Sequence, residues 1–249
     1  MESINDYQER EPRRQTAFGR WGQTVLGHFP FHAGIALLQS LSFLPGAACI
    51  YLYGRLGGAI LLAAGWLLLG LTGPVYAAMQ KMTWQEQFDF PCYLYREFFQ
   101  EVKKNFRQGY CMGLLFTALW GLVLAPLVIA EMSKISLPVW AVIVMLAAAC
   151  LLLLMSAYGF YQMGRWQLSV GAMVKNALLL VFALGLRSFA VLLIWAGYLV
   201  LFALFPPYVL PVNLILGIPA LLTVTAQAIY VPGIDKMMGM ARDMEKKED

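Results

Sequence analysis

The chain has 249 residues, of which 60% are hydrophobic and only 13% are charged, with a formal net charge of +4 and a mean hydropathy of +0.66. The charged fraction is about half of the roughly 25% that is usual for soluble domains, which leaves too little charge to cover a soluble core. A soluble globular domain is therefore excluded. Apolar runs of about 20 residues, the length that spans a bilayer as a helix, recur along the chain and predict an all-α, polytopic transmembrane bundle.

Six apolar segments follow a polar N-terminal segment. Residues 1–30 have mixed charge and lack the short apolar run and small-residue cleavage site of a secretory signal, so we expect a cytoplasmic segment there. We also expect a single transmembrane domain over residues 1–249, because no polar stretch is long enough to build a separate core. The predicted spans cover residues 31–53, 56–78, 109–130, 138–161, 188–205 and 208–231.

Positive charge is distributed unevenly between these spans. With the N-terminus inside, 16 of the 18 Lys and Arg residues lie on the inner side, and Arg55 and Lys134 lie in outer loops. The positive-inside rule therefore predicts that both termini are cytoplasmic. The inner segments are then residues 1–30, 79–108, 162–187 and the tail 232–249.

The stretch REFFQEVKKNFRQGY, at residues 96–110, is the densest cluster of charge. Helical spacing places its aromatic side chains on one face and most of its charges elsewhere, which is typical of a helix in the headgroup plane. A docking surface for a cytoplasmic partner is the alternative. Residues 162–187 form a weaker amphipathic or re-entrant segment before span five. The candidate membrane-surface or partner contacts are Phe98, Phe99, Val102, Lys103, Asn105 and Phe106.

Two longer motifs resemble a known family. The segments TGPVYAAMQKM at 72–82 and REFFQEVKKNFRQGYCMGLL at 96–115 resemble the YesL-like family of bacterial membrane proteins, as does KNAL at 175–178. The resemblance extends over residues 18–236. It implies a multi-pass protein of the bacterial cytoplasmic membrane and an accessory role in carbohydrate-related transport. The matching positions are Gly73, Pro74, Ala77, Arg96, Phe98, Phe99, Lys103, Asn105, Phe106 and Gln108.

Motifs for catalysis and for nucleotide or metal binding are missing from the sequence. There is no GxxxxGK[ST] loop, no HExxH and no GxSxG elbow. His28 and His32 are four residues apart, but Pro30 lies between them and no acidic or cysteine partner is near. We therefore expect a non-enzymatic protein with no catalytic residues, no cofactor and no metal. Nucleic acid is not an expected partner either, because the membrane surface explains the basic segments.

Small residues recur at every fourth position of the predicted third span, at Gly109, Gly113, Thr117 and Gly121. Such a stripe lets another helix approach closely, either within the chain or across a homodimer.

Polar side chains inside the predicted spans are few. Ionisable residues are missing from the span interiors, which lowers the expectation of an ion-coupled carrier. The amide side chains Gln39, Asn213 and Gln227 either form hydrogen bonds between helices or line a substrate pathway.

Three functions follow from these patterns. The first is an accessory or regulatory subunit of a transport system, which contacts the lipid bilayer and other membrane subunits through its inner helices. The second is a small-solute transporter or channel, whose signature would be a cavity lined by the amides. The third is a membrane enzyme acting on lipid-linked substrates, for which the candidate carboxylates are Glu86, Asp89, Glu97, Glu101 and Glu131.

Overall fold

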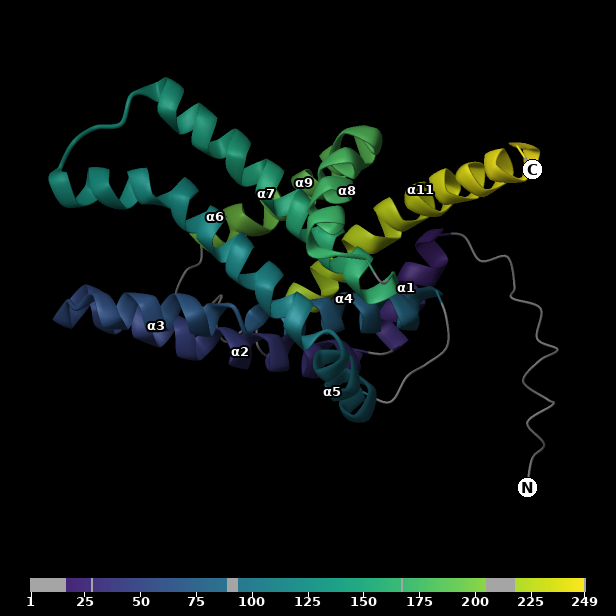
Figure 1. Ribbon diagram of the computed structural model, residues 1–249, viewed down its shortest axis with the longest axis horizontal. Coiled ribbons are helices and arrows are strands. Elements are labelled where there is room, and N and C mark those ends of the chain that lie inside the picture. The colour runs from purple at the N-terminus through teal and green to yellow at the C-terminus, as the bar shows by residue number, and fades with distance from the viewer. Residues whose placement is uncertain (1–16, 28, 89–93, 167, 205–217, 249) are drawn as a thin grey trace.

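The computed structural model describes residues 17–27, 29–88, 94–166, 168–204 and 218–248, and every regular element in these ranges is an α-helix, as the composition predicts (Figure 1). The helices are α1 (Ala17–Gly27), α2 (Phe29–Leu56), α3 (Ala59–Leu69), α4 (Thr72–Phe88), α5 (Leu94–Lys104), α6 (Phe106–Ser133), α7 (Val139–Arg165), α8 (Val170–Ala183), α9 (Leu186–Leu204) and α11 (Ile218–Glu248).

The described residues contain five helical segments long and apolar enough to cross a membrane, or six if one bent pair is counted as a span. Four of them correspond to predicted spans one to four. The second is α3 and α4 taken together, and it extends to Gln87, beyond the predicted end at residue 78. The predicted sixth span began at residue 208, but residues 208–217 lie outside the described residues. Within α11, the candidate span is Ile218–Met237.

The predicted fifth span corresponds to α9, which forms the bent pair with α8. Their axes differ by 97°, and Gly185 stands at the bend with φ of 35°, a conformation that favours glycine. The Ser188 hydroxyl donates to the carbonyl oxygen of Val181 at 2.9 Å and lies 2.9 Å from the hydroxyl of Tyr158. These contacts fasten the bend to α7, so α8 is a separate helix packed on α7 before α9 begins.

Glycines bring α4 and α6 into backbone contact. A Cβ at Gly73 would overlap the carbonyl oxygen of Gly109, and a Cβ at Gly113 would overlap the carbonyl oxygen of Gly70. A Cβ at Gly109 would lie 2.6 Å from the Cα of Pro74. The first half of the small-residue stripe therefore faces α4 of the same chain. Further along α6, a Cβ at Gly121 would meet nothing within 4 Å.

The core consists of two clusters of buried side chains. The larger cluster joins α4, α6, α7, α8, α9 and α11 around Tyr158, Tyr161 and Tyr230. The smaller cluster joins α2, α4, α5 and α11 and includes Phe98, which is only 1% exposed. The expectation that Phe98 contacts a partner or the membrane surface is therefore corrected, because its side chain is enclosed by its own bundle.

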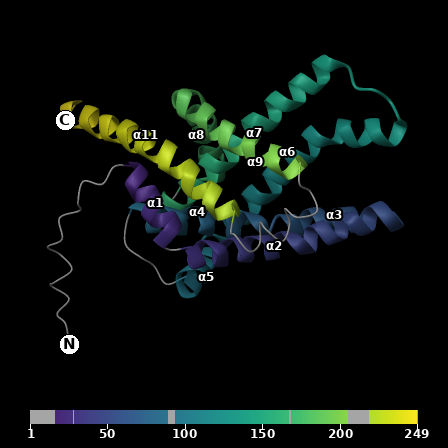
Figure 2. The same ribbon diagram turned by 180° about the vertical axis from the view of Figure 1, so that it is seen from behind.

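Two helical hairpins extend from this core toward the same end of the molecule (Figures 1 and 2). One consists of α2 and α3, and its residues 51–60 are all exposed. The other consists of α6 and α7, where Leu122, Ile129 and Leu146 are exposed. Apolar side chains exposed along candidate spans are suited to contact with lipid tails.

We predict that Gly73→Ala lowers the free energy of unfolding by about 1–3 kcal/mol, because the new methyl group meets backbone atoms of α6 rather than a movable side chain. Gly121→Ala is the matched control, and its stability should be unchanged or rise by up to about 1 kcal/mol, since alanine is the better helix former. Unfolding in mixed micelles followed by circular dichroism measures both. Equal stabilities of the two variants would contradict this account of the α4–α6 contact.

Candidate functional site

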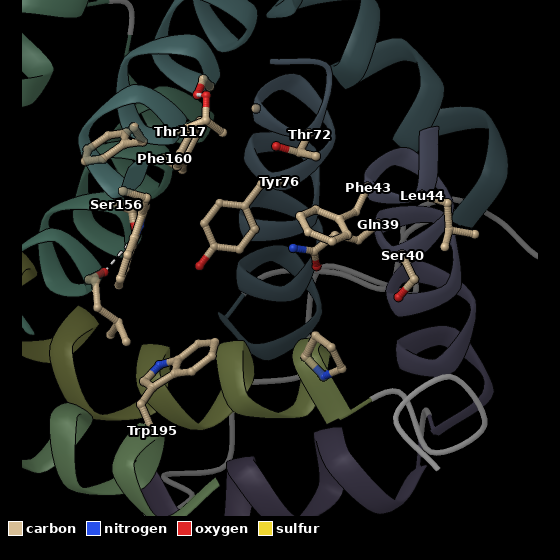
Figure 3. Close-up of a pocket in the computed structure, with 16 residues that line it drawn as sticks. Gln39, Ser40, Phe43, Leu44, Thr72, Tyr76, Thr117, Ser156, Phe160 and Trp195 are labelled. Atoms are coloured by element: carbon tan, nitrogen blue, oxygen red, sulfur yellow. Dashed lines mark hydrogen bonds between the residues drawn. The ribbon is translucent and has the colours of Figure 1, made fainter. Parts of the chain in front are cut away.

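A pocket of about 480 Å³ lies within the bundle, between α2, α4, α6, α7, α9 and the first turn of α11 (Figure 3). Its lining is mostly apolar and aromatic, and Figure 3 shows labelled side chains reaching into it from several helices. The lining residues are Gln39, Ser40, Phe43 and Leu44 from α2, Thr72, Gly73 and Tyr76 from α4, Gly113, Phe116, Thr117 and Trp120 from α6, Leu153, Ser156 and Phe160 from α7, Trp195 from α9 and Pro219 from α11.

The aromatic part of the lining has defined packing. The rings of Tyr76 and Phe160 meet edge to face with centroids 5.1 Å apart, and Phe116 lies 5.7 Å from Phe160. Aromatic pairs of this kind are stabilised beyond the area they bury. Because the three rings come from α4, α6 and α7, they hold these three helices around the pocket.

Four hydroxyl groups in the lining share one arrangement. Each donates its hydrogen to a backbone carbonyl oxygen three or four residues earlier in the chain, so its oxygen retains lone pairs that can accept a further hydrogen bond. The donors Ser40, Thr72, Thr117 and Ser156 lie 2.7–2.8 Å from the carbonyl oxygens of Ala36, Leu69, Gly113 and Leu153, respectively. The pocket therefore offers neutral acceptors from four helices.

Two lining residues each carry a buried polar atom that has no hydrogen-bond partner within the protein. The atoms are Oε1 of Gln39, an acceptor, and Nε1 of Trp195, a donor. Gln39 comes from α2 and Trp195 from α9, and Figure 3 shows them on different walls of the pocket. A buried polar atom without a partner costs about 1–3 kcal/mol, and a polar group of a bound molecule that reached either atom would remove that cost.

The amide predicted at Gln227 forms a contact between helices. Its Nε2 donates to the backbone oxygen of Gln80 at 2.7 Å and to Oε1 of Gln80 at 2.8 Å, which joins α11 to α4. The Tyr230 hydroxyl donates to the same Oε1 at 3.1 Å. Tyr76, which lines the pocket, stands one turn before Gln80 on α4, so this buried network lies close to one wall of the pocket. Asn213 lies outside the described residues.

The residues predicted to contact the membrane surface or a partner lie on or near α5. Phe99 is 56% exposed and Phe106 is 46% exposed, while Val102 packs partly against the smaller core cluster. Lys103 is exposed. The expected continuous face is interrupted at Asn105, because α5 ends at Lys104 and α6 begins at Phe106.

Polar contacts fix this break between α5 and α6. Nδ2 of Asn105 donates to Oε2 of Glu101 at 3.2 Å. The other carboxylate oxygen of Glu101 forms an ion pair with Lys81, which ties α5 to α4.

Arg165 organises the charged end of the bundle, where α4, α7 and α11 meet. Its guanidinium donates to Asp235 at 2.8 Å and to the Tyr161 hydroxyl at 2.6 Å. It also lies over the ring of Trp84, 4.4 Å from the centroid, and 5.3 Å from the centroid of Trp166. Stacking on aromatic faces together with hydrogen bonds to a carboxylate is the chemistry for which arginine is best suited. These contacts are structural, because they occupy the guanidinium within the chain.

The histidine that the structure describes is also part of the packing. His32 is fully buried, and its Nε2 lies 3.1 Å from the backbone oxygen of Thr24. His28 lies outside the described residues. Within the described ranges, no group of three or more His, Cys, Asp or Glu residues is placed so that it could hold a metal ion.

Sequence reasoning identified only part of the pocket. The sequence patterns indicate Gln39, Gly113 and Thr117 as candidate residues, and all three line the pocket. They do not indicate Tyr76 or Trp195. A tryptophan in the interior of a predicted span, away from the aromatic belts, was the available signal for Trp195.

Comparison with known proteins adds one finding. Residues 58–126 match the model of a family described as a protein of unknown function, DUF624. Neither the curated proteins nor the solved structures gave a match. The matched region contains α3, α4, α5 and most of α6, and so includes the α4–α6 contact. Over these residues the chain is similar to an uncharacterised family and has the helices of a multi-pass membrane protein.

Proposed function

We propose that this chain is a non-enzymatic membrane protein that binds a small, largely apolar solute in the pocket between α2, α4, α6, α7 and α9, as a transporter does. The observation that carries the proposal is the pair of buried, unpartnered atoms Gln39 Oε1 and Trp195 Nε1 in a lining that is otherwise mostly apolar. The volume of about 480 Å³ is within the range of small-molecule sites, roughly 300–1,000 Å³.

The chemistry of the lining defines the class of solute. A sugar would need a hydrogen-bond partner for nearly every hydroxyl, and the described lining offers few polar groups among many aromatic and aliphatic side chains. An aromatic or aliphatic molecule with one or two hydroxyl or amide groups fits better. We therefore propose that any carbohydrate-related role, which the YesL-like resemblance implies, does not involve a sugar in this pocket.

The same lining supports a non-enzymatic role. Among the described residues around the pocket there is no Asp, Glu, His, Lys or Cys that would serve as a general acid, a general base or a thiol nucleophile. The Ser and Thr hydroxyls donate to backbone carbonyl oxygens rather than to a neighbouring base. The pocket is therefore better suited to binding than to bond cleavage.

The binding prediction is tested with Gln39→Leu and Trp195→Phe, which each remove one polar group and keep most of the side-chain volume. Loss of one hydrogen bond should weaken binding of a small aromatic alcohol about 3- to 10-fold, equivalent to roughly 0.5–1.5 kcal/mol. The probe is a diazirine-bearing aryl alcohol, cross-linked by light to the protein in lipid vesicles and competed with 1-naphthol.

Mass spectrometry should locate saturable labelling on α2 and α9. Gln100→Leu and Trp140→Phe are the matched controls, since both residues are exposed outside the pocket, and their apparent affinities should equal that of the unchanged protein. Labelling that does not saturate, or equal affinities in all variants, would refute solute binding at this site.

We also propose that both termini lie in the cytoplasm of a bacterial host. The support is the excess of Lys and Arg in the predicted inner segments. Alkaline phosphatase folds only outside the cytoplasm, so it should be active when inserted after Lys134 and inactive when fused after Asp249. The reverse pattern of activity would invert the topology.

An accessory role in a transport system is the second candidate, and one observation favours it. Phe99 and Phe106 are exposed beside the exposed Lys103, in the segment with the densest charge. Aromatic and basic side chains together are suited to contact with a partner subunit as well as with lipid headgroups.

If α5 and the start of α6 dock on a transporter subunit, Phe99→Ala combined with Phe106→Ala should reduce capture of that subunit from native membranes at least 5-fold. Phe189→Ala is the control, because Phe189 is equally exposed on the distant helix α9. Unchanged capture by the double variant would leave these rings as lipid contacts and remove the docking role.

A further inference from the structure

A second cavity, of about 470 Å³, lies between the end of α7, the helix α8 and α11. Among the described residues, it shares no lining residue with the solute pocket. Gln162 and Asn176 are its amide side chains, and Leu179, Leu180, Ala183 and Ile234 form much of its apolar lining. The cavity therefore combines a long apolar wall with two amides, a lining suited to a molecule that is mostly apolar and has a polar group.

Gln162 is the unusual residue of this cavity. Its side chain is only 1% exposed, and its Nε2 is buried without a hydrogen-bond partner in the protein. An N–H donor held away from water without an acceptor is costly, and a leucine of similar size would avoid the cost. The side chain is therefore suited to donate to an acceptor on a molecule that enters the cavity.

The depth of the cavity indicates which acceptor is available. The candidate spans of α7 and α11 end at Arg165 and Met237, and Gln162 lies one turn before the first of these ends. At about 1.5 Å per residue, this is roughly 4–5 Å inside the end of the span. We place the boundary between hydrocarbon and headgroups near these ends, where the ester carbonyls of glycerolipids are the abundant acceptors and carry no hydrogen of their own to donate.

Charge around the cavity suits the rest of such a lipid. Lys175 precedes the lining residue Asn176, and Lys236 stands between the lining residues Ile234 and Met237. Both lysines are exposed. Cations at the membrane surface attract anionic headgroups, whereas the apolar wall made by α8 is suited to an acyl chain.

We propose that this cavity binds one phospholipid, with an ester carbonyl accepting the hydrogen bond of Gln162 Nε2. The acyl chain lies along Leu179, Leu180 and Ala183, and the phosphate faces Lys175 and Lys236. The lipid then fills the space between α7, α8 and α11 and becomes part of the packing that supports the bend between α8 and α9.

The proposal is tested by competition between two lipids that differ only in the ester groups. The full-length protein is purified in detergent with equal amounts of diester phosphatidylglycerol and its diether analogue, and native mass spectrometry counts the lipids retained. The unchanged protein should prefer the diester about 3- to 10-fold, the effect of one hydrogen bond. Gln162→Leu should abolish this preference.

Two further variants test the place of binding. Ala183→Phe fills the cavity and should reduce retention of both lipids at least 5-fold. Ala196→Phe, at an exposed position of α9 outside the cavity, is the matched control and should retain lipid like the unchanged protein.

Equal retention of diester and diether by the unchanged protein would overturn the role of Gln162. A preference that persists in Gln162→Leu would do the same. Because this preference is a ratio measured within one protein, it decides the proposal even if Ala183→Phe fails to fold. Solute binding in the first pocket is unaffected by either result, since the two cavities have separate linings.

Discussion

The backbone contact between α4 and α6 is the constraint on which the rest of the structure depends. Gly73 and Gly109 allow the two helices to touch where any side chain would force them apart. Within a membrane, where lipid tails are as apolar as leucine, such close packing is a principal source of helix association. The contact lies beside the first pocket, so it also sets how far Tyr76 and Thr117 stand from each other across the lining.

Hydrogen bonds between neutral groups hold the next layer of the bundle together. Gln227 joins α11 to α4 through Gln80, and the hydroxyl of Tyr230 bonds to the same amide. Such hydrogen bonds are electrostatically stronger in a low dielectric than in water, although Oε1 of Gln227 is buried without a partner. Charged pairs are placed differently, because Arg165 with Asp235 and Lys81 with Glu101 lie toward the end of the bundle where α5 packs. This separation keeps the cost of burying charge low.

Residues that line the pocket and the second cavity carry buried polar atoms without a hydrogen-bond partner. Most buried polar groups satisfy one another, but the unpartnered atoms of Gln39, Trp195 and Gln162 occur in the linings of the two cavities. A ligand in either cavity that reached these three atoms would supply their missing partners. Other unpartnered atoms belong to residues outside both linings, namely Nε1 of Trp84 and the Oε1 atoms of Gln87 and Gln227.

The sequence by itself determined the all-helical, multi-pass class and most of the span positions. It could do so because a helix in lipid must satisfy its own backbone and needs about 20 apolar residues, a requirement that is local in the chain. It also located Gln39 as a polar group inside a span. Only the tertiary structure decided that Gln39 lines a pocket while Gln227 bonds to Gln80, and that Phe98 is buried while Phe99 is exposed. These outcomes depend on which helix lies opposite each side chain, and that is set by contacts between residues as distant in sequence as Gln80 and Gln227.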